Sequence, residues 1–212
     1  MPSFCTACHW FFNDDRPTCP RDNFPLTKFD PTPIIGSLVG GKYKIEEMLV
    51  PVGNMICATG RQESTGVSVS IKAYGKDSID MDAFFQTVST WKSLKHENVA
   101  ELIDIGEDES GLVYMISKHY FGETLAKRID DLGQVKPDLT LHILAQILSG
   151  LDYLSQNGIA HANIMPANIL MVDDKKIANM AKVFNWLLPP NCFKQTNIEH
   201  PSPLYRSPES ID

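Results

Sequence analysis

The residues best able to bind a metal ion lie at the start of the chain. Cys5 and Cys8 are separated by two residues, and Cys19 is followed three positions later by Asp22, so two turns of equal spacing each offer two ligands. Zinc accepts thiolate, imidazole or carboxylate ligands in a tetrahedral shell. A segment of about 25 residues is too short to be stabilised by a hydrophobic core alone, so it needs a cross-link such as a bound metal ion. The spacing predicts a zinc site of Cys5, Cys8, Cys19 and Asp22, with His9 competing with Asp22 for the fourth position.

A second group of polar residues falls within residues 161–170, which read His-Ala-Asn-Ile-Met-Pro-Ala-Asn-Ile-Leu. This segment resembles the catalytic loop of the protein kinase family, His-Arg-Asp-Leu-Lys-Pro-x-Asn-Ile-Leu. There the aspartate accepts the substrate hydroxyl proton, the lysine meets the transferred phosphoryl group and the asparagine holds a magnesium ion. Asn163 and Met165 stand at the aspartate and lysine positions, and an amide is too weakly basic to act as a general base. The resemblance therefore implies a catalytic loop with no intact catalytic residue.

The nucleotide-binding motifs of the family are also altered. Residues 69–72, Val-Ser-Ile-Lys, are similar to the family's Val-Ala-Ile-Lys, so Lys72 takes the position of the lysine that contacts the ATP phosphates. Residues 94–99 resemble Leu-Arg-His-Pro-Asn-Ile and place Thr87 where a glutamate normally pairs with that lysine. The three positions of the glycine-rich loop fall on Val50, Val52 and Met55. Side chains at these positions would obstruct the close approach of the backbone to phosphate.

The metal-binding triplet is changed in the same way. Residues 181–187, Ala-Lys-Val-Phe-Asn-Trp-Leu, match the bacterial pattern Ala-Lys-Val-x-Asp-Phe-Gly, which places Asn185 at the magnesium-binding aspartate. A competing register, with a shorter hairpin at residues 173–174, puts Asn179 there instead. Magnesium prefers charged oxygen ligands, so the amides of Asn168 and Asn185 are not expected to hold it. Lys72, Asn168 and Asn185 are the candidate nucleotide-site residues, with ATP binding expected to be weak or absent.

The elements that must position these residues follow from periodicity. Short alternating runs at residues 43–45 and 67–71 predict strands, and apolar residues at helical spacing predict helices over 80–95 and 138–154. Strands, one helix, more strands and then helices is the order of the two-lobed kinase fold. The predicted fold class is α+β, a protein-kinase-like fold with a β-rich N-lobe and a helical C-lobe. A small module precedes it and resembles the zinc ribbon found before bacterial serine/threonine kinases, through Cys-Pro-x-Asp at residues 19–22 and Pro25-Leu26.

The expected parts of the chain are a zinc-ribbon-like module at 1–27, a linker at 28–42, a kinase-like N-lobe at 43–120 and a partial C-lobe at 121–212. Residues 202–209, Ser-Pro-Leu-Tyr-Arg-Ser-Pro-Glu, resemble the close of the activation segment in bacterial kinases, and the sequence ends three residues later. We therefore expect the C-lobe to be truncated after this segment. The uncovered apolar face of the 138–154 helix is then expected to be covered by a protein partner, a second copy of the chain or a rearranged chain end.

Composition narrows the function classes. A net charge of −7 and a pI near 5.3 argue against a binder of nucleic acid or of anionic membranes. The sequence contains no run of about 18 apolar residues and no signal peptide at its start, which predicts a cytoplasmic protein without a membrane segment. Three of the five cysteines lie in the first 19 residues, which favours a metal site or free thiols over a disulfide framework. Cys57 and Cys192 are interpreted as a buried strand thiol and a loop thiol.

Together the motifs predict a pseudokinase that works as a binding or scaffold module. Four separate elements of one active site are altered: the phosphate loop, the partner of the lysine, the general base and the metal ligand. Two alternatives stay open. One is an atypical active serine/threonine kinase that recruits other residues, with Asp173 and Asp174 as candidates by proximity in sequence. The other is a truncated fragment with no folded role.

Overall fold

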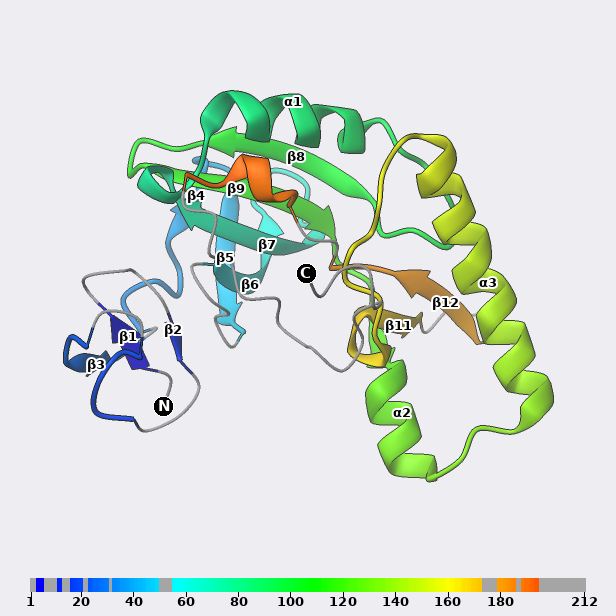
Figure 1. The fold of residues 1–212 in the computed structure, drawn as a ribbon. Helices are drawn as coiled ribbons and strands as arrows, with labels where there is room; N and C mark the ends of the chain where they lie inside the picture. Colours follow the sequence, from blue (N-terminus) through cyan, green and yellow to red (C-terminus); the bar gives the residue numbers. More distant parts are fainter. Residues whose placement is uncertain are drawn as a thin grey trace. The chain divides into compact units, whose positions relative to one another are not determined.

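The structure is a computed structural model that describes residues 3–5, 11–12, 16–20, 23–30, 32–49, 55–172, 179–185 and 188–194. The chain divides into two compact units, whose elements are labelled in Figure 1. The first unit comprises Met1–Ser93, Leu102–His119 and Pro189–Glu199. The second unit comprises Leu94–Glu101, Tyr120–Leu188 and His200–Asp212.

The start of the first unit is a small antiparallel sheet of three strands in the order β2-β1-β3. The strands are β1 (Ser3–Cys5), β2 (Phe11–Phe12) and β3 (Leu26–Lys28). A tight turn precedes β3: the Asn23 amide donates to the Cys19 carbonyl at 2.9 Å, and Asn23 takes a left-handed backbone conformation with φ of 61°. Asparagine adopts this conformation more readily than most residues, because its short polar side chain can form local hydrogen bonds.

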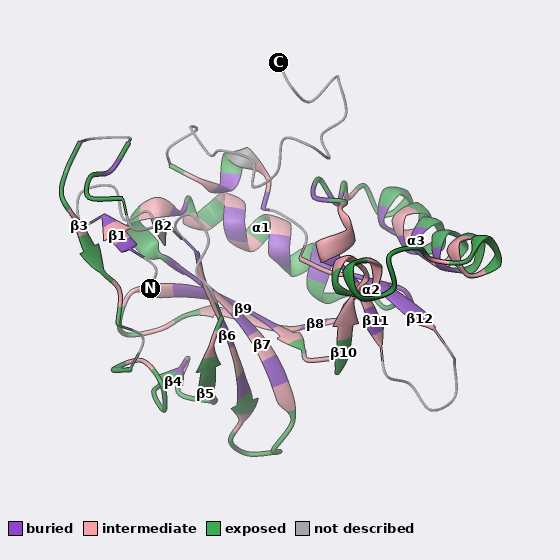
Figure 2. Cartoon of the chain, turned by 90° about the horizontal axis from the view of Figure 1, so that it is seen from below, coloured by how far each residue is buried: buried purple, intermediate pink, exposed green. Residues whose placement is uncertain are grey.

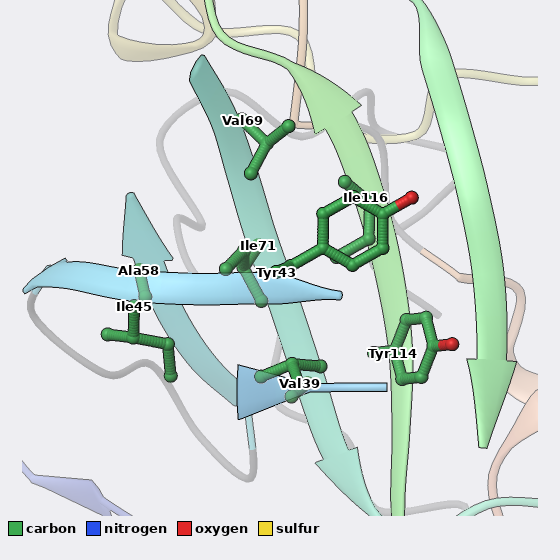
Figure 3. Close-up of a cluster of buried hydrophobic side chains, with 9 residues drawn as sticks. Val39, Tyr43, Ile45, Ala58, Val69, Ile71, Tyr114 and Ile116 are labelled. Carbon is green, nitrogen blue, oxygen red and sulfur yellow. The ribbon is translucent and has the colours of Figure 1, made fainter. Parts of the chain in front are cut away.

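The larger part of the first unit is a six-stranded antiparallel sheet in the order β4-β5-β6-β7-β9-β8. Its strands are β4 (Leu38–Val39), β5 (Tyr43–Met48), β6 (Met55–Gln62), β7 (Ser68–Gly75), β8 (Leu102–Glu107) and β9 (Leu112–Lys118). Side chains alternate along β7: Val69, Ile71 and Ala73 are buried, whereas Ser70 and Lys72 are half-buried. The apolar face carries the core cluster of Figure 3: Val39, Tyr43, Ile45, Ala58, Val69, Ile71, Ala73, Tyr114 and Ile116.

One long helix belongs to this unit. After the short 3-10 helix η1 (Lys76–Ser78), Asp80 caps α1 (Met81–Lys92) by accepting a hydrogen bond from the Ala83 amide at 3.0 Å. The helix buries Phe84, Val88 and Trp91, which is the spacing that places side chains on one face. The sequence predicts strands at residues 43–45 and 67–71 and a helix over 80–95. The structure confirms these elements as β5, β7 and α1.

Asp104 of β8 anchors the C-terminal end of α1. Its carboxylate accepts hydrogen bonds from Lys92 Nζ at 3.1 Å and from Tyr43 Oη at 2.9 Å. Burial acts to raise the pKa of the Asp104 carboxyl, but the hydrogen bonds from Tyr43 and Lys92 outweigh it and hold that pKa below its usual range. Ionised Asp104 therefore stabilises the folded chain.

The sign of this effect gives a pH prediction. Because the folded pKa of Asp104 lies below the unfolded value of about 3.9, its contribution is present above that pH and disappears as the pH falls through the folded value. Asp104→Asn is expected to lower the free energy of unfolding by about 1–2 kcal/mol at neutral pH. Urea unfolding at a series of pH values should then show a shallower acid-induced loss in this variant. Equal pH slopes in the two proteins would contradict this role of Asp104.

In its described residues, the second unit holds a small antiparallel sheet in the order β10-β11-β12 and two α-helices. The elements are β10 (Gly122–Thr124), α2 (Leu125–Leu132), α3 (Pro137–Gln156), the 3-10 helix η2 (Pro166–Asn168), β11 (Ile169–Val172) and β12 (Met180–Val183). Helix α3 packs on β12 and approaches the segment 94–101 closely, since a Cβ at Gly150 would lie 2.9 Å from the Asn98 carbonyl oxygen. Asn98 is buried, and its Nδ2 donates to the Ala181 carbonyl at 2.9 Å. These contacts fix the strand that leads to Asn185.

Helix α3 carries two apolar faces of unequal burial, as the colouring of Figure 2 shows. Ile143, Ile147, Gly150 and Leu154 are buried. Leu141, Leu144 and Leu148 are exposed by 67%, 46% and 63%. The periodicity of the sequence predicted the helix correctly, but it did not separate the buried apolar residues from the exposed leucines. Among the described helices, none is long and apolar enough to cross a membrane.

Candidate active site

Three asparagines come together in the second unit. Asn163 and Asn168 lie on the segment between α3 and β11, and Asn185 follows β12 by two residues. Asn163 and Asn168 are exposed by only 3% and 4%, and Asn185 is half-buried. The antiparallel pairing of β11 with β12, with Ile169 opposite Val183, brings the ends of these two segments side by side. The fold therefore collects the predicted base and metal positions at one place.

The three residues form a closed ring of hydrogen bonds, in which the side-chain nitrogens donate to one side-chain oxygen and two main-chain carbonyl oxygens. Asn163 Nδ2 donates to the Asn185 carbonyl oxygen at 3.0 Å, and Asn185 Nδ2 donates to Asn168 Oδ1 at 2.9 Å. Asn168 Nδ2 completes the ring by donating to the Asn163 carbonyl oxygen at 2.8 Å. Each amide nitrogen thus has an oxygen acceptor within the ring, and the Asn168 oxygen that could face a metal ion faces an N–H donor instead.

The backbone around the ring is held by further contacts. His161 Nε2 lies 3.0 Å from the Phe184 carbonyl oxygen, and the Phe184 amide donates to the Asn168 carbonyl at 3.1 Å. Ala162 and Asn185 take left-handed conformations, with φ of 57° and 63°. Such conformations in residues other than glycine are sparsely populated and need support from the surrounding structure. The buried His161 is part of that support and lies within the scaffold of the site.

The chemistry available at the ring is limited. Asn163 Oδ1 is buried and accepts no hydrogen bond from the residues that the structure describes, and an amide oxygen cannot accept a proton near neutral pH. Met165, at the predicted lysine position, is half-buried and offers no charge. Its carbonyl accepts the Asn168 amide at 2.8 Å, which shapes the turn into η2. The ring supplies hydrogen bonds, with no carboxylate or ammonium group among its members.

Asn179, the candidate of the competing register, lies in different surroundings. It precedes β12, its Oδ1 accepts a hydrogen bond from Arg128 Nη1 of α2 at 3.0 Å, and its carbonyl accepts one from Gln146 Nε2 of α3 at 3.0 Å. It takes a left-handed conformation with φ of 56°. The structure brings Asn185, and not Asn179, together with Asn163 and Asn168.

Lys72 belongs to β7 in the first unit. In the sheet register it pairs with Cys57 of β6 and Met115 of β9. Burial lowers the pKa of the Lys72 amine, and the nearby Cys57 thiol acts in the opposite direction. Thr87, at the predicted glutamate position, lies on α1, and its Oγ1 accepts a hydrogen bond from Cys192 Sγ at 3.6 Å. Threonine carries no charge, so this position cannot supply an ion-pair partner to the lysine.

Sequence reasoning missed one polar pair on the same face of the sheet as Lys72. Ser70 Oγ lies 2.9 Å from His119 Nδ1, and burial lowers the pKa of His119. Ser70 is two residues before Lys72, so both side chains point to the same side of β7. A histidine after a strand gives no signal in the sequence that would connect it to a serine 49 residues away.

The predicted zinc ligands are only partly within the described residues. Cys5, at the end of β1, and Cys19, at the start of the turn before β3, are both fully buried, at 0% and 1% exposure. Cys8, His9 and Asp22 lie outside the described residues, as do Val50 and Val52 of the predicted phosphate loop and residues 173–178 and 195–212. Burial of two thiols in so small a sheet fits the chemistry of a structural zinc site.

Sequence comparison assigns the family. Residues 53–212, three quarters of the chain, match the profile of the protein kinase domain. The chain belongs to the protein kinase domain family. The matched region contains Lys72, Thr87, the asparagine ring and the segment that ends at residue 212. The resemblance of the individual motifs to kinase motifs is thereby confirmed at the level of the family.

The relatives of this kinase domain include proteins from bacteria and eukaryotes. Serine/threonine-protein kinase PrkC of Bacillus subtilis is 29% identical over 142 residues, which cover 65% of this chain and 22% of PrkC. CBL-interacting serine/threonine-protein kinase 2 of Arabidopsis thaliana is 28% identical over 160 residues, which cover 72% of this chain and 34% of that protein. The chain thus spans about a fifth to a third of the length of these relatives.

Structural comparison agrees with the family at the level of fold. A crystal structure of Rad53, residues 1–466, in complex with AMP-PNP superposes with a TM-score of 0.63 at 23% identity. The match covers 70% of this chain and 39% of that one. The predicted protein-kinase-like fold, with a β-rich N-lobe and helices, is therefore confirmed.

Proposed function

We propose that this protein kinase domain is a pseudokinase that acts as a binding or scaffold module and binds ATP weakly or not at all. The observation that carries the proposal is the closed ring of Asn163, Asn168 and Asn185. In the family, two of these positions hold magnesium and the third carries the general base. Here they are neutral amides whose nitrogens all donate to oxygens within the ring, and Asn168 Oδ1, an oxygen that could face a metal ion, already accepts a hydrogen bond from Asn185 Nδ2.

Electrostatics supports the same proposal. Phosphoryl transfer depends on positive charge placed against the phosphates and on metal ions held by carboxylates. Within the ring there is no charge, and Thr87 offers none to fix Lys72. Loss of the general base alone typically costs about 10² to 10⁴ in rate. Losses at the base, the metal site and the lysine partner together favour binding over catalysis.

The proposal is tested by nucleotide binding and phosphate transfer. We expect ATP with magnesium to leave the melting temperature of the purified chain unchanged, and labelled phosphate not to be incorporated into the chain or a generic protein substrate. Lys72→Ala is the matched control. A robust ATP-dependent shift that disappears in Lys72→Ala would overturn the statement on nucleotide binding. Phosphate incorporation that survives Asn163→Ala and is lost in Lys72→Ala would establish an atypical active kinase.

For the N-terminal module we propose one structural zinc ion held by Cys5, Cys8, Cys19 and Asp22. Support comes from the burial of Cys5 and Cys19 and from the turn closed between Cys19 and Asn23, whose left-handed residue lies one position after Asp22. Such a turn suits a knuckle in which residues three apart share a metal ion. The zinc ion would be structural, and the module would serve stability or partner binding.

For partner binding we propose the exposed face of α3. Leu141, Leu144 and Leu148 lie on it, beside a groove of about 380 Å³ between α2 and α3. The groove is lined by Leu125, Ile129, Gln134, Val135, Pro137, Thr140, Ile143 and Leu144. Exposed apolar surface of this kind marks sites of protein association. We expect a protein partner or a second copy of the chain to bind at this surface.

A further inference from the structure

Residues 189–194, here called the clamp segment, are built into the first unit although they follow Asn185 closely in sequence. Phe193 forms an antiparallel bridge with Ile79. The Asp80 amide donates to the Cys192 carbonyl at 2.9 Å, and the Lys194 amide donates to the Ser78 carbonyl at 3.1 Å. The clamp segment is therefore paired like a strand with the residues that lead into α1.

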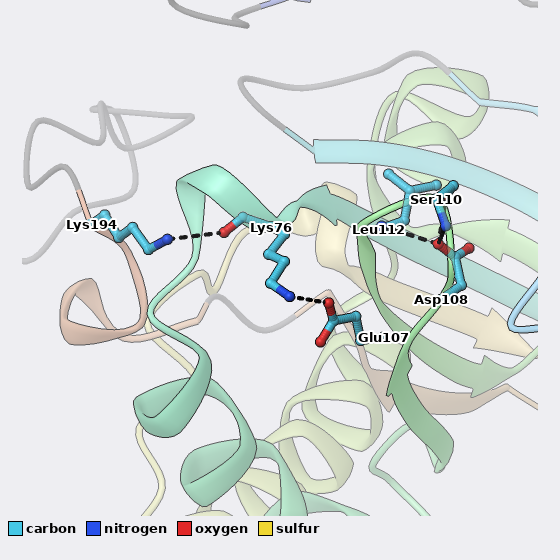
Figure 4. A network of polar contacts seen from close by, with 6 residues as sticks. All are labelled: Lys76, Glu107, Asp108, Ser110, Leu112 and Lys194. Atoms are coloured by element: carbon cyan, nitrogen blue, oxygen red, sulfur yellow. Dashed lines mark hydrogen bonds and ion pairs between the residues drawn. The ribbon is translucent and has the colours of Figure 1, made fainter.

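Side chains of the clamp segment reinforce this pairing. Cys192 in η3 (Pro190–Cys192) is fully buried, at 0% exposure, and its Sγ lies 3.6 Å from Thr87 Oγ1 on α1. The Phe193 ring meets Tyr74 edge-to-face, with centroids 5.9 Å apart and the planes at 72°. Lys194 Nζ donates to the Lys76 carbonyl at 3.4 Å, as Figure 4 shows. The structure places Cys192, interpreted from the sequence as a loop thiol, in this short turn and buries it against α1.

Among these contacts, the one between Cys192 and Thr87 involves the residue at the family's glutamate position. Thr87 stands where the family resemblance expects the glutamate that ties this helix to Lys72, and a neutral hydroxyl cannot form that ion pair. Instead, the Cys192 thiol donates a hydrogen bond to the Thr87 hydroxyl. Burial raises the pKa of Cys192, which keeps the thiol protonated as the donor.

We infer that the clamp segment holds the N-terminal half of α1 against the sheet and takes over the anchoring role of the missing lysine–glutamate pair. The other end of α1 is anchored separately by Lys92 and Asp104. Release of the clamp segment would therefore free the first turns of α1 and leave its last turn in place. The inference goes beyond the proposed function, because it holds whether or not the chain binds nucleotide.

Hydrogen exchange of the full chain, read by mass spectrometry on peptides from α1, tests the inference. Phe193→Ala removes the edge-to-face contact, and Lys194→Pro removes the amide that donates to Ser78 while leaving the buried side chains in place. Both variants are expected to raise exchange in the first half of α1 by at least about tenfold, which corresponds to about 1.4 kcal/mol. Peptides from β6 and β7 should keep their protection.

Two control variants test whether a rise in hydrogen exchange in α1 is specific to loss of the clamp-segment contacts. Asn191→Ala alters an exposed residue of the same segment, and Lys72→Ala removes the residue that the family uses to hold the helix. Neither is expected to change exchange in α1. Unchanged exchange in Lys194→Pro, or an equal rise in Lys72→Ala, would overturn the inference. If Phe193→Ala unfolds the whole unit, Lys194→Pro alone decides: a rise confined to α1 supports the clamp, and its absence rejects it.

Discussion

Asn185→Asp is expected to destabilise the chain and to make it respond to divalent metal ions. The change replaces the Nδ2 donor with a carboxylate oxygen that faces Asn168 Oδ1 across 2.9 Å, so two acceptors oppose each other in a half-buried site. The expected loss is about 2 kcal/mol in the free energy of unfolding. Thermal unfolding should show a melting temperature lower by about 4–8 °C for a chain of this size.

Magnesium or manganese should then recover part of this loss, because a cation between the new carboxylate and the Asn168 oxygen satisfies both. Binding at tenfold excess over Kd contributes about 1.4 kcal/mol. Asn179→Asp is the matched control: the same substitution faces Arg128 Nη1, so a charge-assisted hydrogen bond forms and no metal response is expected. A melting temperature that Asn185→Asp leaves unchanged would contradict the ring. A metal response confined to Asn179→Asp would favour the competing register.

Removal of zinc is expected to unfold the N-terminal module and leave the six-stranded sheet folded. Structural zinc contributes about 10–16 kcal/mol of apparent binding free energy in small zinc domains. Elemental analysis of the purified chain should give one zinc per molecule. Cys19→Ser should abolish it, whereas Cys57→Ser, a matched change in β6, should leave it intact. Limited proteolysis after chelation should cut the first 30 residues before any site in β5–β9.

The zinc affinity of two further variants distinguishes Asp22 from His9 as the fourth ligand. Asp22→Ala should weaken zinc affinity by more than the roughly 10–100-fold that loss of a group hydrogen-bonded to a ligand costs, and His9→Ala should leave the affinity nearly unchanged. The reverse ranking would assign His9. A chain without zinc in which Cys5 and Cys19 stay protected from thiol reagents would refute the proposal and leave them as ordinary core residues.

Much of the fold was predictable because its periodic signals are strong. Phe84, Val88 and Trp91 recur at helical spacing, and Val69 and Ile71 alternate, so α1 and β7 were found from the sequence. Hydrophobicity alone could not say which apolar residues of α3 are covered, since the exposed Leu144 and Leu148 repeat at the same spacing as the buried Ile143 and Ile147. The clamp segment has no periodic signal, so its place beside α1 depends on contacts with residues about 100 positions earlier.

The site was predictable as a set of positions and not as a set of interactions. Family motifs gave Asn163, Asn168 and Asn185, and the structure brings them together. An amide carries both a donor and an acceptor, so the sequence could not show that each nitrogen would meet an oxygen of the next residue. The contacts of Cys192 with Thr87 and of His119 with Ser70 were not predicted, because each joins residues that lie far apart in the chain.

The asparagine ring also bears on how this protein could change over evolutionary time. Asn163→Asp sets a carboxylate oxygen against the Asn185 carbonyl oxygen, and Asn185→Asp sets one against Asn168 Oδ1. Each of these single changes places two acceptors against each other and is therefore expected to lower the free energy of unfolding on its own. A carboxylate at either position therefore needs a second change that supplies a hydrogen-bond donor or a bound cation opposite it.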